Sequence, residues 1–159
     1  MIPGFTQETS KKAQREKNRL EKQLGIDSLI KAKHFTFVAT RAFPQGGNTV
    51  DLTTNSNFVK FSPDKIESYM PFFGRAYSID YGGDGGIKFI AKPEEFNIVA
   101  KKEGKGYEIN VSVPVTRDQF KLTLFVGIDG YATLTIISNQ RSTISYYGEI
   151  SKTEEPKGK

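Results

Sequence analysis

Cysteine is absent from this 159-residue sequence, and the one histidine is His34. A chain without thiols has no disulfide scaffold, no thiolate nucleophile and no zinc–thiolate site. One imidazole is also too few for most transition-metal sites and for most nucleophile–base pairs. We therefore expect no metal and no other cofactor, and the composition favours a non-enzyme over an enzyme.

Long apolar runs are missing as well. No segment approaches the roughly 20 apolar residues of a membrane-spanning helix. The opening residues, MIPGFTQETSKKAQREKNRL, have no apolar stretch between the start and the charges, so we do not expect them to act as a signal peptide. Aromatic residues make up 12% of the chain, and at this length we expect one folded domain with its own core.

The net charge of +5 belongs to one segment. Residues 11–33 hold eight Lys or Arg and three acids, whereas the remainder from His34 onward is nearly neutral. The charges of both signs alternate as in a solvated helix, so we interpret this segment as a tether. A basic arm for nucleic acid or for an anionic membrane is the alternative, and we expect no nucleic-acid partner.

Residues 8–24 are rich in helix-forming residues, and Gly25 directly after them predicts a glycine cap that ends this helix. Asp27 then predicts the N-cap of a second, short helical piece. The second piece is the one that we expect to dock, because it has an apolar edge formed by Ile26, Leu29 and Ile30.

From residue 34 onward apolar residues recur at every second position, as in YEINVSVPVT at 107–116, which predicts strands with one buried face. Pro114 predicts an edge or a bulge in its strand. The connections after residue 101 are too short for parallel crossovers, so the C-terminal half is an antiparallel meander of five strands. Two further hairpins are predicted earlier, around PQGG at 44–47 and around SPD at 62–64.

The predicted fold is mostly β. We expect a long antiparallel meander of about nine or ten strands, curled into a barrel-like or two-layer body because twist accumulates across so many strands. The predicted organisation is a charged N-terminal helical segment at 1–33, an antiparallel β domain at 34–150 and a disordered tail at 151–159.

The stretch MPFFGRAYSIDYGGDGGIKF at 70–89 combines aromatic rings, an arginine, two aspartates and many glycines. A phosphate loop is not expected, because the glycines lead into a strand and not into a helix. Asp80 and Asp84 are also too few oxygen ligands for a calcium loop. The glycines predict a tight loop with positive backbone dihedrals.

The same stretch supplies the candidate ligand-binding residues: Arg75, Tyr77, Asp80, Tyr81 and Asp84. One interpretation is structural, with Arg75 paired to an aspartate to fix a bulged loop. The other is a binding site, in which aromatic rings and a charged fork receive a sugar ring or a carboxylated ligand. His34 opens a strand without a visible partner and is interpreted as a surface residue.

The order of motifs FVATRAFPQGGNTVDLT, SYMPFFGRAYSIDYGGDGGIKF, YEINVSV and ATLTIISNQRSTISYYGEI resembles a family of uncharacterised exported domains from the Bacteroides group, the domain of unknown function DUF4251. The resemblance covers about residues 26–150. It implies an exported protein, periplasmic or anchored to the outer membrane as a lipoprotein, with its leader missing here. It assigns no activity, so no functional residue is transferred from it.

Together these observations predict a non-enzymatic cell-envelope module that binds an unidentified small molecule, glycan or envelope protein. Membrane tethering through a missing N-terminal anchor is compatible with it. Two alternatives stay open. One is a carboxylate-dependent glycan hydrolase that uses Asp80 or Asp84, and the other is a purely structural or interaction protein without a small-molecule site.

Overall fold

The computed structural model describes residues 3–53, 57–71, 86–115, 118–139 and 142–153. One long helix, α1 (Pro3–Lys31), precedes ten strands and a short 3-10 helix, η1 (Lys102–Gly104). The strands are β1 (Phe35–Pro44), β2 (Val50–Asp51), β3 (Phe58–Phe61), β4 (Ile66–Met70), β5 (Ile87–Ala91), β6 (Glu95–Ala100), β7 (Tyr107–Val115), β8 (Asp118–Val126), β9 (Tyr131–Ile137) and β10 (Ile144–Ser151).

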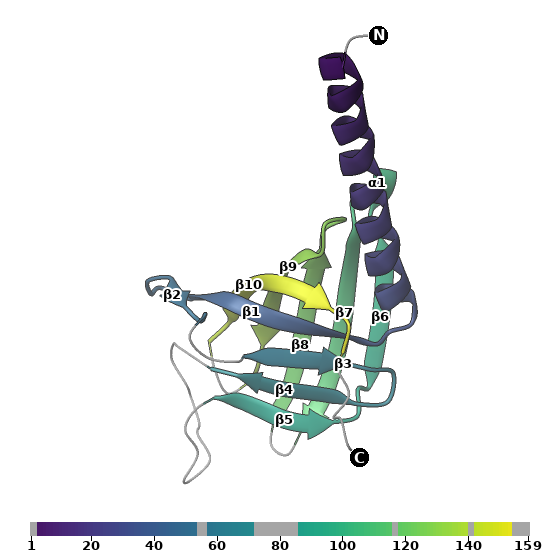
Figure 1. Cartoon of the computed structure of the whole chain (residues 1–159). Coiled ribbons are helices and arrows are strands. Elements are labelled where there is room, and N and C mark those ends of the chain that lie inside the picture. The colour runs from purple at the N-terminus through teal and green to yellow at the C-terminus, as the bar shows by residue number, and fades with distance from the viewer. Residues whose placement is uncertain (1–2, 54–56, 72–85, 116–117, 140–141, 154–159) are drawn as a thin grey trace, which may run out of the picture.

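All ten strands belong to one antiparallel sheet, in the order β5-β4-β3-β1-β10-β9-β8-β7-β6, with β2 attached to β1. The sheet curls into a half-barrel from which α1 projects (Figure 1). The predicted fold class is therefore confirmed, including the C-terminal meander β6–β10 and the hairpins β1–β2 and β3–β4. The sequence did not reveal that the first and last long strands, β1 and β10, pair at the centre.

The curl brings the two ends of the sheet face to face. Strands β1, β3, β4 and β5 run across strands β6–β9 (Figure 1), and aromatic rings fill the space between them. Phe89 of β5 stacks on Phe120 of β8 with ring centroids 4.9 Å apart, and Phe61 of β3 meets Phe96 of β6 edge-on at 6.2 Å. Such pairs add to the burial of the rings themselves, so they hold the half-barrel closed.

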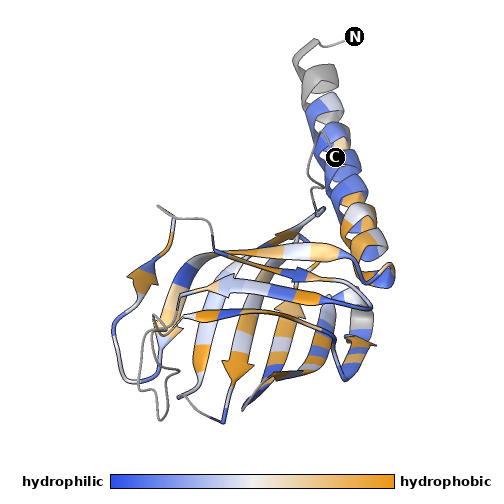
Figure 2. Cartoon of the chain, turned by 90° about the horizontal axis from the view of Figure 1, so that it is seen from below, coloured by the Kyte–Doolittle hydropathy of each residue, from blue (hydrophilic) through white to orange (hydrophobic). Residues whose placement is uncertain are grey.

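The core lies on the inner face of the sheet, where the alternation of the sequence places it. Buried residues recur at every second position through the middle of β7–β10, and Figure 2 shows the matching alternation of apolar and polar bands along the strands. The largest fully buried side chains come from eight of the ten strands and from α1: Tyr146, Phe35, Phe37, Phe61, Ile30, Ile66, Met70, Ile87, Ile109, Leu122, Leu124 and Leu134.

One glycine permits the central pairing of β1 with β10. The register between these strands shifts between Ala39 and Arg41, opposite Gly148. A Cβ at Gly148 would lie 1.9 Å from the carbonyl oxygen of Val38 and 2.9 Å from the Cα of Ala39. Only a residue without a side chain fits there, because both obstacles are backbone atoms of the neighbouring strand.

Pro114 is tolerated because β7 is locally an edge there. The pairing of β7 with β6 ends at Ser112, whereas its pairing with β8 continues through Pro114↔Gln119 without a register shift. Pro114 therefore lies where one side of the strand has no β6 partner for the missing N–H. Of the two predicted situations, an edge or a bulge, the structure shows a local edge on the β6 side of β7 and no register shift against β8.

The predicted helix end at Gly25 is wrong, because α1 continues through Gly25 and Asp27 to Lys31. Glycine within a helix costs roughly 1 kcal/mol relative to alanine, which tertiary packing can offset. The helix ends instead with Lys33 in the left-handed region (φ 55°), where Lys33 N donates to Ile30 O and His34 N donates to Leu29 O. This is the Schellman arrangement, with lysine where glycine is usual.

The end of α1 next to the sheet is the docked part, as predicted. Ile26 and Ile30 are buried, whereas Leu20 and Leu24 are exposed on the projecting part, and Figure 2 shows the apolar residues gathered near the sheet. Ile26 packs against Gly130 in the β8–β9 turn, where a Cβ would lie 2.9 Å from the Ile26 methyl carbon. Gly130 also has a positive φ of 89°.

A polar contact joins the same end of α1 to β7. The Tyr107 hydroxyl donates to Asp27 Oδ1 at 2.8 Å. This bond to the carboxylate, with partial burial and the negative charge of Asp27, raises the pKa of Tyr107. Asp27 therefore binds the sheet and does not cap a second helix.

The domain boundaries at residues 33 and 150 stay a prediction.

Candidate binding surface

The five predicted site residues all lie outside the described residues. Arg75, Tyr77, Asp80, Tyr81 and Asp84 belong to the segment 72–85 between β4 and β5. The structural interpretation, the binding interpretation and the hydrolase interpretation of this segment therefore stay predictions.

The strand ends that flank this segment are held by buried hydroxyl groups. Met70 and Ile87 are the last pair of the β4–β5 ladder. Tyr146, whose side chain is buried, donates its hydroxyl to Pro71 O at 2.5 Å, and Ser68 donates to Ile87 O at 2.8 Å. The base of the β4–β5 connection is thus fixed from the core, where a lost hydrogen bond is costly.

The outer face of the same strands carries a row of cross-strand neighbours. The register places six residues side by side over six strands: Tyr131, Glu149, Val38, Phe58, Tyr69 and Lys88. Tyr131, Val38 and Tyr69 belong to the exposed large hydrophobic side chains. Most outward positions of a half-exposed sheet are polar, so rings and apolar groups in register there are a feature to explain.

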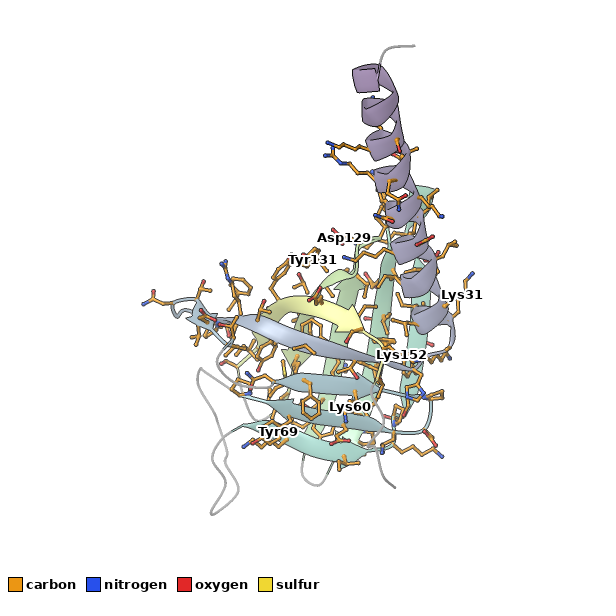
Figure 3. The ribbon with its side chains drawn as sticks, viewed as in Figure 1. Lys31, Lys60, Tyr69, Asp129, Tyr131 and Lys152 are labelled. Carbon is orange, nitrogen blue, oxygen red and sulfur yellow. The ribbon has the colours of Figure 1, made fainter. Side chains whose placement is uncertain are left out.

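The part of the row on β3, β4 and β5 forms a compact group, the β3–β5 cluster, which we define as Phe58, Lys60, Tyr69 and Lys88. Phe58 and Tyr69 stack with centroids 5.9 Å apart and planes 18° apart. Lys60 Nζ lies 5.2 Å from the centroid of Phe58, and Lys88 Nζ lies 4.6 Å from that of Tyr69. Figure 3 shows Lys60 and Tyr69 on the front face of β3 and β4.

Two more ring–lysine contacts lie elsewhere on the outer face. Tyr131 and Tyr147 stack at 6.1 Å with nearly parallel planes, and Lys22 of α1 lies 5.5 Å from the Tyr131 centroid. Phe125 of β8 receives Lys101 at 4.6 Å. An ammonium over a ring face is held by roughly 0.5–1 kcal/mol at an exposed site.

The ring–lysine contacts place ammonium groups on the outer face of the sheet. Lys22, Lys60 and Lys101 form no ion pair with an acid of the described residues, in contrast to Arg19, which pairs with Glu16 on α1. A ring contact leaves the charge of an ammonium group in place, so the outer face combines apolar ring surface with positive charge. Tyr69 is 47% exposed, which leaves ring surface open to a ligand. This combination suits a ligand with an apolar face and negative groups.

No group of three or more His, Asp or Glu residues could hold a metal ion in the described part of the chain. Asp118 instead accepts hydrogen bonds from Gln119 N, Asn139 N and Ser138 Oγ, which fixes the start of β8 against the β9–β10 turn. His34 is exposed, as predicted.

Asp51 has a similar local role in the β2 turn. Its Oδ1 accepts from the backbone N–H of Thr53 at 2.8 Å and from the Thr53 hydroxyl at 2.7 Å. The backbone hydrogen bond first, then the hydroxyl and the charge of Arg41, lower the pKa of Asp51. Because Arg41 is the cross-strand neighbour of Asp51, this group stabilises the tip of the β1–β2 hairpin.

Sequence reasoning missed the β3–β5 cluster. The hairpin predicted around SPD at 62–64 corresponds to β3 and β4, but the sequence analysis does not single out the outward positions of Phe58 and Tyr69. The signal was present: both rings occupy positions where period-two alternation calls for polar residues. Their contact required the register Phe58↔Tyr69, which the strand patterns alone leave open.

No helix in the described part of the chain has both the length and the hydropathy to cross a bilayer.

Comparison with known proteins gives a family and a fold. A family model described as Domain of unknown function (DUF4251) matches residues 16–150. The structure is similar to the crystal structure, at 1.95 Å resolution, of a DUF4251 family protein from Bacteroides eggerthii DSM 20697. The TM-score is 0.64 at 20% sequence identity, and the match covers 82% of this chain and 87% of that chain. No curated protein matches.

Proposed function

The chain belongs to the DUF4251 family of domains of unknown function, and on this premise we propose that it is a non-enzymatic module of the cell envelope that binds an acidic glycan on the β3–β5 cluster. The observation that carries the proposal is the stacked pair of Phe58 and Tyr69 with Lys60 and Lys88 over the two rings. Export is the part of the proposal that the family resemblance implies.

Each part of the cluster has a counterpart in such a ligand. The C–H groups of a sugar ring pack on the negative face of an aromatic ring. The carboxylates of an acidic sugar are attracted to the lysine ammonium groups that lie at the same rings. The cluster is also built on paired strands, β3, β4 and β5, which hold the rings in a fixed geometry before a ligand arrives.

The test is a calorimetric titration of the protein with polygalacturonate, a glycan with a carboxylate on each sugar. Neutral dextran serves as the uncharged comparison. We expect binding to polygalacturonate alone. We expect Tyr69→Ala to weaken the affinity for polygalacturonate by roughly 10-fold. The substitution removes both the stack on Phe58 and the ring that Lys88 contacts.

A matched control is available on the same face of the sheet. Phe125 also has a lysine 4.6 Å from its ring centroid but belongs to β8, outside the cluster. Phe125→Ala should leave the affinity within about twofold if the cluster is the site. Equal losses from Tyr69→Ala and Phe125→Ala, with both proteins folded, would show non-specific attraction to basic surface and would contradict the proposal.

The hydrolase alternative is distinguished by its product. Incubation of the wild type with the same glycan should release no new reducing ends. Release that disappears in Asp84→Asn at unchanged thermal stability would establish the enzyme instead.

A further inference from the structure

The edge strand β6 directs every second residue's backbone groups away from the sheet, and no strand of the described residues pairs with them. It lies at one end of the strand order, with β7 as its one neighbour in the sheet. Lys101 N donates to Gly106 O at 2.9 Å, and the register continues with Val99↔Glu108 and Asn97↔Asn110. Hydrogen-bonded pairs alternate along an antiparallel ladder, so the odd-numbered residues bond to β7.

The even-numbered residues of β6, Phe96, Ile98 and Ala100, consequently direct their N–H and C=O groups away from the sheet. One described contact agrees with this orientation: Lys33 Nζ donates to Phe96 O at 3.5 Å. A carbonyl oxygen has two lone pairs, so Phe96 O can still accept a second hydrogen bond. An edge of this kind is a template for another strand.

The charges on this edge complement themselves. Residues 94–102 read EEFNIVAKK, with acids at the start and lysines at the end. In an antiparallel pair of two such strands with Ile98 opposite Ile98, Glu95 of each copy faces Lys101 of the other. The same register sets Phe96 opposite Ala100, so outward-directed backbone groups meet outward-directed backbone groups along the pair.

The side chains that would form these cross-strand pairs are accessible to a second copy of the chain. Glu95 is exposed and has no hydrogen bond or ion pair with another described residue. Lys101 lies on the outer face, over Phe125. Val99, on the same face, is 55% exposed. The opposite edge of the sheet lacks such a pattern, because β5, IKFIA, has a lysine and no acid.

We propose that β6 pairs antiparallel with β6 of a second copy of this chain about a two-fold axis at Ile98, which gives a homodimer with one continuous sheet. The contact is isologous, so it closes after two copies and does not propagate. It is also small for a permanent interface, so the dimer forms reversibly as the protein concentration rises.

Charge reversal tests the register in the full chain, by sedimentation velocity at about 50 mM salt, where screening is weak. Glu95→Lys alone and Lys101→Glu alone should each weaken dimer formation by roughly 10-fold, because like charges then face each other twice. The double variant should dimerise like the wild type. An equimolar mixture of the two single variants should form a heterodimer, since one of its two cross-strand pairs then joins the introduced lysine to the introduced glutamate and the other is the native pair.

A cysteine probe tests the axis directly, because the wild type has no thiol. Under mild oxidation, Ile98→Cys should form a disulfide-linked dimer, since residues paired across strands lie within disulfide reach. Ile90→Cys, on the more exposed Ile90 (66%) of β5, is the control and should stay monomeric.

Several results would overturn the proposal. They are a wild type that stays monomeric up to about 1 mM with no Ile98→Cys dimer, single charge variants that dimerise as well as the wild type, and faster cross-linking at position 90. Dimers that persist while the β6 variants have no effect would place self-association elsewhere on the molecule, and would overturn it equally.

Discussion

Single atoms decide whether the centre of this sheet can form. The carbonyl oxygen of Val38 lies so close to Gly148 that a Cβ on residue 148 would overlap with the backbone of Val38 and Ala39. Alternation in ISYYGEIS predicts a strand, and the buried side chains at Ile144, Tyr146 and Ile150 agree with it. Nothing local in that sequence indicates that its glycine faces a register shift in a strand that lies more than a hundred residues earlier.

We predict that Gly148→Ala lowers the free energy of unfolding by about 3 kcal/mol, because neither β1 nor β10 can move away from its other neighbour. Gly25→Ala is the control, since an added Cβ there meets nothing within 4 Å. That change should raise stability by roughly 0.5–1 kcal/mol. Urea unfolding measures both, and a Gly148→Ala protein as stable as the wild type would contradict the crowding seen at this position.

At the level of elements, periodicity was sufficient for the strands and insufficient for the helix. The alternation of residues 107–136 predicted β7, β8 and β9 with the correct buried faces, because period two follows from strand geometry itself. Gly25 and Asp27 carried the usual marks of a helix boundary. Tertiary contacts overrode them, since Ile26 and Ile30 are buried and Asp27 binds Tyr107.

The same contact predicts how pH acts on the junction of α1 with β7. The pKa of Tyr107 is raised above its ordinary value of 10.0 in the folded protein, so the neutral, donating phenol is favoured there. Its contribution to stability is fully present below pH 10 and is lost as the pH rises through the folded pKa. Tyr107→Phe should therefore cost about 1 kcal/mol at pH 8 and less above pH 10.

Thermal unfolding at pH 8 and at pH 11 measures this difference. Tyr131→Phe is the control, because the Tyr131 hydroxyl makes no hydrogen bond to another described residue, and it should change stability little at either pH. A Tyr107→Phe deficit that grows with pH would show that the phenolate, and not the phenol, stabilises the junction.

At the scale of the whole molecule, the strand order sets where the sheet opens first. The central strands β1, β10, β9 and β8 are bonded on both sides, whereas β5 and β6 have one neighbour each. We predict that amide hydrogen exchange is slowest in the central strands and fastest in β5, in β6 and in the projecting part of α1. Exchange measured by mass spectrometry at low protein concentration tests this gradient, and uniform protection from β5 to β6 would contradict it.

The barrel-like body was predictable from the sequence because so many short antiparallel strands have few other solutions. The candidate site was not. The residues chosen for it lie at 72–85, outside the described part of the chain, and the β3–β5 cluster forms through a register that no single strand encodes. Phe89 likewise packs on Phe120, and Phe61 on Phe96, between strands that are far apart in the sequence. The residue pattern of one such strand does not indicate which other strand it will contact.

The pairing of β1 with β10 also orders events during synthesis. Of the long strands, β1 leaves the ribosome first, and it receives its main partner from Ile144–Ser151, roughly a hundred residues later. Until then β1 can pair with β2 and β3 alone. The two halves of the sheet, β1–β5 and β6–β9, therefore leave the ribosome before the strand that joins them. Bringing β10 back to β1 closes a loop of roughly a hundred residues, and this costs conformational entropy before the contacts between the two strands form. The chain therefore completes its core only after β10 has been translated.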